Sequence, residues 1–303
     1  AIKEPNLLIT NGATEALSLI FHYINTITPE PFSAMAISPV YESYRHLPSF
    51  YNRPFIEYAF DQSTPIDFDS LEQTIQGNNT KVLFVGSPGN PFGFVFSKAE
   101  LMNLQTVCER NKCFLILDAV YHELYYETKP KFPIETITPY LFYVDSFSKL
   151  LSITGWRIGY FIAHECHTQA IRNIHDYTGL CASSILQEAL SRYIEVSNFG
   201  QLYVNELREK LCTNYLKISE SIKKLGFTVP KALGGYFVWA KLPEKYTDGF
   251  KFAIDLYDNT GVAVVPGIHF TKHGKQFIRI NIARESNEID LALKKISEFV
   301  LEK

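Results

Sequence analysis

The chain has 303 residues, of which 46% are hydrophobic and 20% are charged, values typical of a globular protein with one large and one smaller domain. A formal net charge of −3 gives no broad electrostatic basis for binding nucleic acid or an anionic membrane. No apolar run approaches the length of a membrane span, and no secretory signal pattern opens the chain. We therefore predict neither a nucleic-acid partner nor a membrane partner.

The cysteines argue against disulfides and against a metal centre. There are five, an odd number, and they lack paired metal-ligand spacing. We predict reduced thiols in a cytoplasmic protein. The segment His164-Glu-Cys-His167 brings candidate ligands together in a short stretch, but no second cluster accompanies it, so we predict no metal site.

Short apolar runs alternate along the chain with longer helix-like stretches. This alternation is typical of an α/β domain with a largely parallel sheet. Apolar residues recur at a helical period over residues 99–112, and Ser97 with Glu100 predicts a capping box before them. The strand-like runs are residues 7–9, 34–37, 82–85, 114–117, 141–144 and 158–162.

Five of these runs end in segments rich in polar residues, glycine or proline. Ligands of open α/β sheets bind at the carboxyl ends of the strands, so we expect these segments to converge on one cleft. They are Asn11-Gly-Ala-Thr-Glu15, Ser38-Pro-Val-Tyr41, Gly86-Ser-Pro-Gly-Asn90, Asp118-Ala-Val-Tyr121 and the segment that begins at Ser146.

The last third of the chain predicts a separate, smaller unit. Residues 190–225 have few helix breakers and predict one long helix that links two lobes. Strand-like runs at 234–239, 262–265 and 277–281 precede an amphipathic helix at 288–301, which favours an α+β lobe. We predict a large domain over residues 1–205 and a small C-terminal domain over 206–303.

Lys149 carries the strongest chemical signal. It follows a buried run in Ser146-Phe-Ser-Lys149, and burial lowers the pKa of a lysine and leaves a neutral amine that attacks carbonyl compounds. The planar fork of Arg157 suits a phosphate dianion. Together they indicate a site for a phosphorylated aldehyde such as pyridoxal 5′-phosphate (PLP). Alone, the tetrapeptide is a weak signal, because most lysines extend to solvent.

The residues after the first strand favour an anion. Gly12, Ala13 and Thr14 open a helix, where small residues let backbone N–H groups approach a phosphate. An ordinary N-cap at Asn11 or Thr14 explains the same residues equally well. No Gly-Lys-Ser/Thr follows, so this is not a Walker A loop.

Four residues on other strand ends fit the ring of such a cofactor. Asp118 needs a cationic partner, which a pyridinium nitrogen provides, although a helix-capping role is the alternative. Tyr121 and Asn90 can hydrogen-bond the phenolate oxygen of the ring. Tyr41 can stack on it, but among 18 tyrosines simple packing is the stronger reading of Tyr41 alone.

A substrate carboxylate has a candidate partner in the C-terminal lobe. Arg279 lies inside the strand-like Phe277-Ile-Arg-Ile-Asn281, so it is either exposed at a sheet edge or paired with a carboxylate. Arg284 competes for the same role, but its position beyond the run favours the surface.

Together these residues resemble the fold-type I PLP enzymes, specifically the class I/II aminotransferases, from about residue 7 to the C-terminus. Residues 146–159 match the lysine-site pattern of that family at every constrained position. The resemblance implies an aspartate aminotransferase-like fold, with a mostly parallel, seven-stranded sheet flanked by helices in the large domain and a smaller C-terminal α+β domain. It also implies PLP as cofactor and a homodimer.

The resemblance assigns a role to each candidate residue. Lys149 forms the Schiff base with PLP and acts in catalysis with Asp118 and Tyr121. The remaining roles are phosphate binding by Ser146, Ser148, Arg157, Gly12, Ala13 and Thr14, pairing of Asp118 with the ring nitrogen, hydrogen bonds from Asn90 and Tyr121 to the ring hydroxyl, stacking by Tyr41, and binding of the substrate carboxylate by Arg279 with Asn90.

The chain departs from the family pattern in three places. The Asn-Pro-Thr-Gly loop of the family is Asn90-Pro-Phe-Gly93 here. The chain starts near the first phosphate loop, so we expect the N-terminal segment of the family to be missing. Residues 177–187 contain no arginine to bind a second carboxylate, which argues weakly against an aspartate specialist.

The function that follows is transfer of an amino group from an L-amino acid to a 2-oxo acid by a ping-pong mechanism. Two alternatives stay open. One is a PLP-dependent lyase or decarboxylase on the same fold, because a fold does not determine a reaction. The other is a non-catalytic sensing domain cut from a longer regulator.

Overall fold

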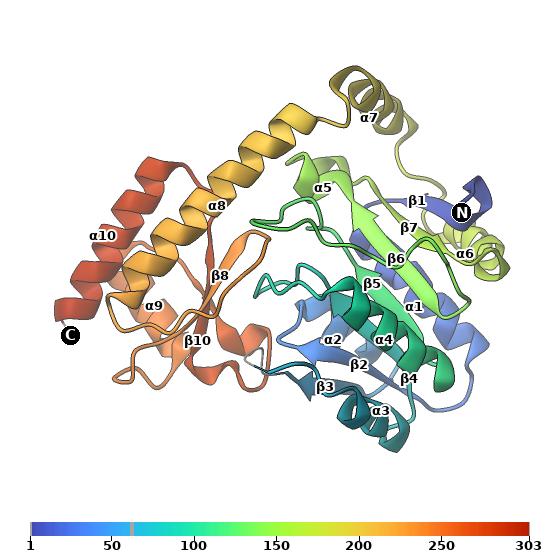
Figure 1. Ribbon diagram of the computed structural model, residues 1–303, viewed down its shortest axis with the longest axis horizontal. Coiled ribbons are helices and arrows are strands. Elements are labelled where there is room, and N and C mark those ends of the chain that lie inside the picture. Colours follow the sequence, from blue (N-terminus) through green and yellow to red (C-terminus); the bar gives the residue numbers. More distant parts are fainter. Residues whose placement is uncertain (1, 61–63, 303) are drawn as a thin grey trace.

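The computed structural model describes residues 2–60 and 64–302 of the chain. In this part of the chain a seven-stranded sheet runs through the larger lobe in the order β1-β7-β6-β5-β4-β2-β3 (Figure 1). Its strands are β1 (Leu7–Thr10), β2 (Ser33–Ser38), β3 (Phe55–Ala59), β4 (Thr80–Gly86), β5 (Phe114–Asp118), β6 (Leu141–Ser146) and β7 (Gly159–Ala163).

The sheet is mostly parallel, as predicted. Strands β2 to β6 pair in parallel, and only β7 runs antiparallel to its neighbours β6 and β1. Five of the six predicted runs lie within these strands, and the run 158–162 begins one residue before β7. The sequence did not predict β3, because this edge strand is only partly buried and its apolar signal is weak.

Helices cover both faces of this sheet. Val82 and Phe84 of β4 face the core under α1 (Ala13–Ile27), α2 (Glu42–Ser49) and α6 (Glu165–Thr178). Leu83 and Val85 face the core under α3 (Phe68–Gly77) and α4 (Lys98–Arg110). Strands buried on both faces read as continuous apolar runs, which is why the sequence revealed them. The capping box of α4 forms as predicted.

The C-terminal lobe has its own sheet and core. In the described residues a three-stranded sheet takes the order β8-β10-β9, with β8 (Phe237–Lys241), β9 (Val265–Pro266) and β10 (Phe277–Asn281). Helices α8 (Gln201–Lys223), α9 (Gly249–Thr260) and α10 (Ser286–Glu302) pack against it. The predicted run 277–281 coincides with β10, whereas β8 and β9 begin later than predicted. The proposed boundary after residue 205 lies within α8 and stays a prediction.

The predicted single helix over residues 190–225 is wrong. The chain forms α7 (Ser184–Ser197), breaks, and resumes as α8, which crosses between the lobes (Figure 1). At the break Asn198, Phe199 and Gly200 have φ angles of 47°, 59° and 66°. Consecutive left-handed residues cannot continue a right-handed helix.

Short helical turns complete the fold. These are α5 (Phe147–Leu150), η1 (Glu4–Asn6), η2 (Thr154–Trp156), η3 (Gly267–His269) and η4 (Gly274–Gln276). Among residues 2–60 and 64–302, no helix is both long and apolar enough to cross a membrane.

Candidate active site

A cavity of about 450 Å³ lies at the carboxyl ends of the strands in the large sheet. Segments after β1, β2, β4, β5 and β6 line it, and residues of β8 and β10 complete the lining, so the predicted convergence is confirmed. The predicted residues that line it are Ala13, Thr14, Tyr41, Asn90, Asp118, Tyr121, Ser146, Ser148, Lys149, Arg157 and Arg279.

Lys149 stands on the short helix α5, directly after β6. Its side chain is partly buried, and this burial, with the positive charges of Arg157 and Arg279, lowers its pKa. Tyr236 donates a hydrogen bond of 2.7 Å to the backbone oxygen of Lys149 and so holds the turn. The result is an amine with an increased neutral fraction inside a polar cavity.

Arg157 packs against the segment after β1 that is predicted to bind phosphate, residues 11–14. Its Nη1 donates to the backbone oxygen of Thr154 at 3.0 Å, and its Nη2 donates to that of Asn11 at 3.1 Å. Gly12 does not line the cavity but lies beneath this guanidinium, with φ of +81°. A Cβ at Gly12 would lie 2.4 Å from Nη2, so only glycine permits the approach.

The two serines of the lysine segment differ in their remaining hydrogen-bonding capacity. Ser146 caps α5: its Oγ donates to the backbone oxygen of Ile158 at 3.0 Å and accepts from the amide of Ser148 at 3.1 Å. The Oγ of Ser148 is buried and has no hydrogen-bond partner among the described residues. A buried hydroxyl without a partner costs stability, so an anion in the cavity would satisfy it.

Asp118 ends β5 and is buried against an unpredicted partner. Tyr44 donates a 2.6 Å hydrogen bond to its Oδ2, and the amide of Val120 donates to Oδ1 at 3.3 Å. Burial raises the pKa of Asp118 to about 6, although the Tyr44 hydrogen bond opposes the rise. Such a carboxylate gains most from a cationic partner.

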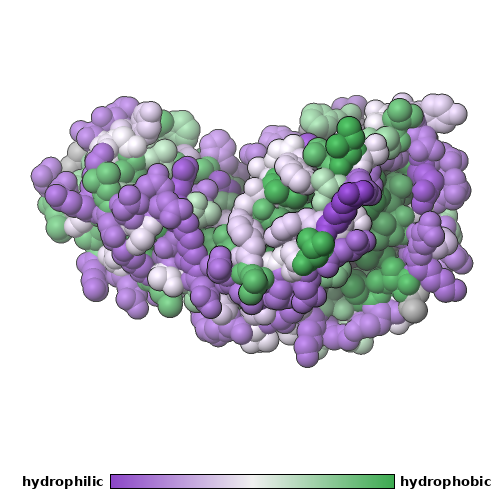
Figure 2. Space-filling model, turned by 90° about the horizontal axis from the view of Figure 1, so that it is seen from above, coloured by the Kyte–Doolittle hydropathy of each residue, from purple (hydrophilic) through white to green (hydrophobic). Residues whose placement is uncertain are grey.

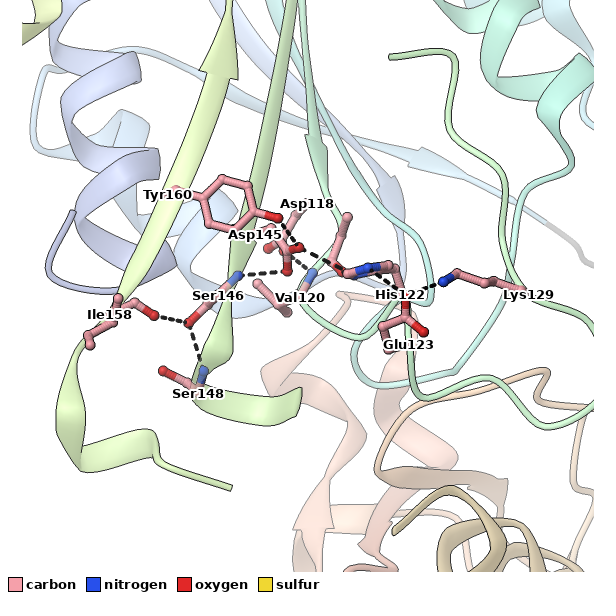
Figure 3. Close-up of polar contacts among 11 residues, drawn as sticks. Asp118, Val120, His122, Glu123, Lys129, Asp145, Ser146, Ser148, Ile158 and Tyr160 are labelled. Atoms are coloured by element: carbon pink, nitrogen blue, oxygen red, sulfur yellow. Dashed lines mark hydrogen bonds and ion pairs between the residues drawn. The ribbon is translucent and has the colours of Figure 1, made fainter. Parts of the chain in front are cut away.

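A largely buried polar network lies at the strand ends (Figure 3). Asp145 accepts from the amide of Ser146 and from the hydroxyl of Tyr160, each at 2.7 Å, and its Oδ2 lies 3.4 Å from Nδ1 of His122. Burial disfavours the charged imidazole, but Asp145 and Glu123 outweigh it and raise the pKa of His122 to about 10. The network joins β6 and β7 to the segment after β5. The sequence did not indicate it, because these residues meet only through strand pairing.

Arg279 reaches the cavity from β10. Its Nη1 donates to Oδ1 of Asn90 at 2.9 Å. Its guanidinium carbon lies 4.1 Å from the ring centre of Phe237 and 4.7 Å from that of Phe270. The competing Arg284 is exposed and borders a different cavity, so of the two arginines only Arg279 lines this site.

The aromatic candidates differ in burial. Tyr121 is buried and packs edge-on against Tyr236, with ring centres 5.7 Å apart, whereas Tyr41 is half-buried. Phe92 lies in the loop Asn90-Pro-Phe-Gly93, which differs from the family pattern, and it is buried with Trp239 and Phe270 of the C-terminal lobe. The bulky residue in this loop therefore packs between the lobes.

The cavity suits PLP by its donor set. Three cationic side chains line it together with the orphaned Ser148 hydroxyl, and Asp118 supplies a buried carboxylate. A phosphate dianion fits the first group, and a protonated ring nitrogen fits Asp118. The residues present fit the cofactor.

Comparison with known proteins identifies the family of this chain. The model of the family described as "Aminotransferase class I and II" matches residues 1–296. The probable N-acetyl-LL-diaminopimelate aminotransferase of Bacillus subtilis is 27% identical over 301 residues, which cover 99% of this chain and 75% of that protein. The aspartate aminotransferase of Thermotoga maritima is 27% identical over 305 residues, which cover 99% of this chain and 76% of that protein.

Solved structures share the fold. The crystal structure of the Thermotoga maritima aspartate aminotransferase aligns with a TM-score of 0.88 and 25% identity, over 99% of this chain and 77% of that one. The Thermus thermophilus aspartate aminotransferase with maleate aligns with a TM-score of 0.89 and 24% identity, over 97% and 76% of the two chains, and shows the fold alone.

The fold has aspartate aminotransferase-like architecture, and the family match defines a PLP-dependent enzyme. The chain belongs to the class I and II aminotransferase family, and its activity is that of an aminotransferase.

Proposed function

We propose that the protein transfers the amino group of an L-amino acid to a 2-oxo acid by a ping-pong mechanism, with PLP bound to Lys149 as a Schiff base. One observation carries the proposal. The partly buried Lys149, whose pKa is lowered, lines the same cavity as the buried carboxylate of Asp118 and the guanidinium groups of Arg157 and Arg279. Amine, carboxylate and two cations are the set that this chemistry needs.

The proposed binding of the cofactor uses both ends of the cavity. Arg157 and the unpartnered hydroxyl of Ser148 bind the phosphate, with Ala13 and Thr14 beside them and Gly12 beneath Arg157. At the other end, Asp118 pairs with the ring nitrogen and keeps it protonated. Asn90 and Tyr121 hydrogen-bond the ring hydroxyl, Tyr41 stacks on the ring, and Ser146 contributes by capping α5.

When bound, PLP supplies the aldehyde that takes the amino group and a ring that accepts electrons. Arg279 binds the α-carboxylate of the substrate and orients its Cα–H bond toward Lys149. The neutral amine of Lys149 then takes the α-proton as a general base. Asn90, Phe237 and Phe270 hold the guanidinium of Arg279 in place for this step.

The partners we propose are an amino acid, a 2-oxo acid and a second copy of this chain. Large hydrophobic side chains from the last turn of α6 to the start of α8 are exposed, and such a patch is typical of an interaction surface. Hydrophobic residues also gather on the half of the molecule that carries α7 when it is seen from above (Figure 2). The exposed residues are Tyr177, Leu180, Ile185, Val196, Phe199 and Leu202.

A dimer through this patch predicts a simple measurement. Light scattering after size exclusion is expected to give twice the chain mass, and Ile185→Glu with Leu202→Glu is expected to give one chain mass. A monomeric parent protein would contradict the proposal. The cytoplasmic location also stays a proposal, supported by five free cysteine thiols.

The visible absorption spectrum tests the proposed function. Purified protein with PLP is expected to develop a yellow band that bleaches on addition of a mixture of L-amino acids and returns on addition of a 2-oxo acid. Lys149→Ala is expected to abolish the band, whereas Lys98→Ala, at a partly exposed lysine of α4 outside the cavity, is expected to keep it.

Two outcomes would count against transamination. A band that bleaches while product is released without any need for an oxo-acid acceptor would favour a lyase or decarboxylase. Turnover retained in a folded Lys149→Ala variant would remove the proposed role of Lys149.

A further inference from the structure

A nearly buried carboxylate outside the cavity joins the two lobes. Glu57 lies on the edge strand β3, and its side chain is 7% exposed. Its Oε1 accepts from Nη2 of Arg45 at 2.8 Å. Its Oε2 accepts from Oγ1 of Thr271 at 2.8 Å, from the amide of Lys272 at 3.2 Å and from Oγ of Ser38 at 3.4 Å. Four donors from three separate segments thus converge on one side chain.

The C-terminal donors belong to the loop that packs on Arg279. Thr271 follows Phe270, whose ring centre lies 4.7 Å from the guanidinium carbon of Arg279. The backbone oxygen of Phe270 accepts from the amide of Val40 at 2.9 Å. Holding Thr271 in place therefore holds the aromatic face on which Arg279 rests.

The remaining donors flank Tyr41, which lines the cavity from the large lobe. Ser38 ends β2, and Arg45 stands on α2, so both surround the turn that presents Tyr41. Glu57 therefore links the segment that carries Tyr41, the proposed ring-stacking residue, to the segment that supports Arg279, which is proposed to bind the substrate.

We propose that Glu57 is a positioning residue that clasps the loop 267–274 to the segment 38–45 and thereby fixes Arg279 relative to Tyr41 and Lys149. The inference rests on the proposed function, which gives Arg279, Tyr41 and Lys149 their roles. Removal of the carboxylate leaves the partly exposed Arg45 and the buried hydroxyl of Thr271 without this acceptor. An unpaired buried hydroxyl is costly, so the loop is expected to detach locally. Arg279 then loses its orientation, while Lys149 and Asp118, on β6 and β5, keep theirs.

The clasp predicts a particular kinetic pattern. Binding of the substrate carboxylate weakens, whereas proton transfer at Lys149 continues once the substrate is bound. A residue that merely stabilises the fold would instead lower the melting temperature and leave the half-saturating substrate concentration unchanged.

The first experiment is hydrogen exchange on the PLP-free protein, so that it does not depend on catalysis. We compare the parent protein with Glu57→Ala, Glu57→Gln and the control Glu72→Ala, which removes a carboxylate that pairs with Arg110 far from the cavity. In Glu57→Ala, the amides of Val40 and Lys272 are expected to exchange at least about fivefold faster, while that of Leu83 in β4 is unchanged. Glu57→Gln keeps an acceptor and is expected to restore part of the protection. Unchanged exchange at Val40 and Lys272 in Glu57→Ala would overturn the clasp.

The second experiment follows the bleaching of bound PLP by an equimolar mixture of the twenty common L-amino acids. Glu57→Ala is expected to raise the half-saturating total concentration about tenfold, which corresponds to one lost buried interaction, with the limiting rate within about threefold of the parent. An unchanged half-saturating concentration, or loss confined to the limiting rate, would overturn the positioning role. If the parent protein binds no PLP, the proposed function fails, and the exchange experiment still decides whether Glu57 clasps the two segments.

Discussion

The hydroxyl of Tyr44 donates a 2.6 Å hydrogen bond to Oδ2 of Asp118, and both residues are largely buried and border the cavity. Tyr44 lies three residues after Tyr41, which is the N-cap residue of α2, so the start of this helix presents Tyr41 to the cavity and places Tyr44 against Asp118. Burial of Asp118 has a larger effect on its pKa than this hydrogen bond, so the pKa is raised to about 6.

The raised pKa makes Asp118 a source of pH-dependent instability in the PLP-free protein. The folded state binds this proton more tightly than the unfolded state, so the contribution to stability is present below about pH 4 and is lost as the pH rises through about 6. Asp118→Asn is therefore expected to raise the free energy of unfolding at pH 8 by about 1–3 kcal/mol and to change it little at pH 4. Urea denaturation at both pH values measures this. A gain of equal size at both pH values, or the same gain in the exposed-site control Asp69→Asn, would contradict the explanation.

Gly12 is expected to be required for the phosphate end of the site. Alanine at this position would place a Cβ 2.4 Å from Nη2 of Arg157 and would strain a backbone with φ of +81°. Gly12→Ala is expected to weaken PLP binding at least about tenfold, a loss that displacement of one charge-assisted contact can produce. Equilibrium dialysis measures the affinity. Gly77→Ala, where a Cβ meets nothing within 4 Å, is the matched control and is expected to bind PLP normally.

His122 is expected to stabilise the protein up to high pH. Its pKa of about 10 in the folded state exceeds the ordinary value, so its contribution is complete below about pH 6.5 and is lost as the pH rises through about 10. His122→Gln is expected to cost about 2–3 kcal/mol at pH 6 and much less at pH 10.5, because Asp145 and Glu123 then face a neutral group in either protein. Urea denaturation at the two pH values measures the cost, with the exposed His46→Gln as control. A cost that does not shrink at high pH would show that packing, not charge, explains His122.

Glu42 is expected to disfavour substrates with a second carboxylate. It lines the cavity with Arg279; burial lowers the pKa of that arginine, and the charge of Glu42 opposes this effect. Glu42→Lys is expected to raise the ratio of kcat/KM for aspartate to that for alanine about two- to fivefold, the range for an exposed charge. Steady-state kinetics with both amino acids measure the ratio. The same increase in Glu220→Lys, on the exposed side of α8, would assign the effect to net charge instead.

Local patterns predicted most of the large lobe and the proposed chemical residues. The runs at 82–85 and 114–117 are buried on both faces, and such strands are visible in sequence as continuous apolar stretches. Asp118 ends such a strand, and Lys149 and Asn90 follow the ends of two others within a few residues, so the rule for strand ends placed them at one edge. The edge strand β3 and the break at residues 198–200 were not predicted, because partial burial and left-handed backbone leave weak local signals.

The sequence by itself determined where the chemical residues lie along the chain: Asp118, Lys149 and Arg279 each stand in or beside an apolar run. Only the tertiary structure decided which side chains support them. Tyr44 reaches Asp118 across 74 residues, His122 meets Asp145 through the pairing of β5 and β6, and Glu57 meets Thr271 across 214 residues. Such contacts depend on the relative placement of whole elements, and no local periodicity records that placement.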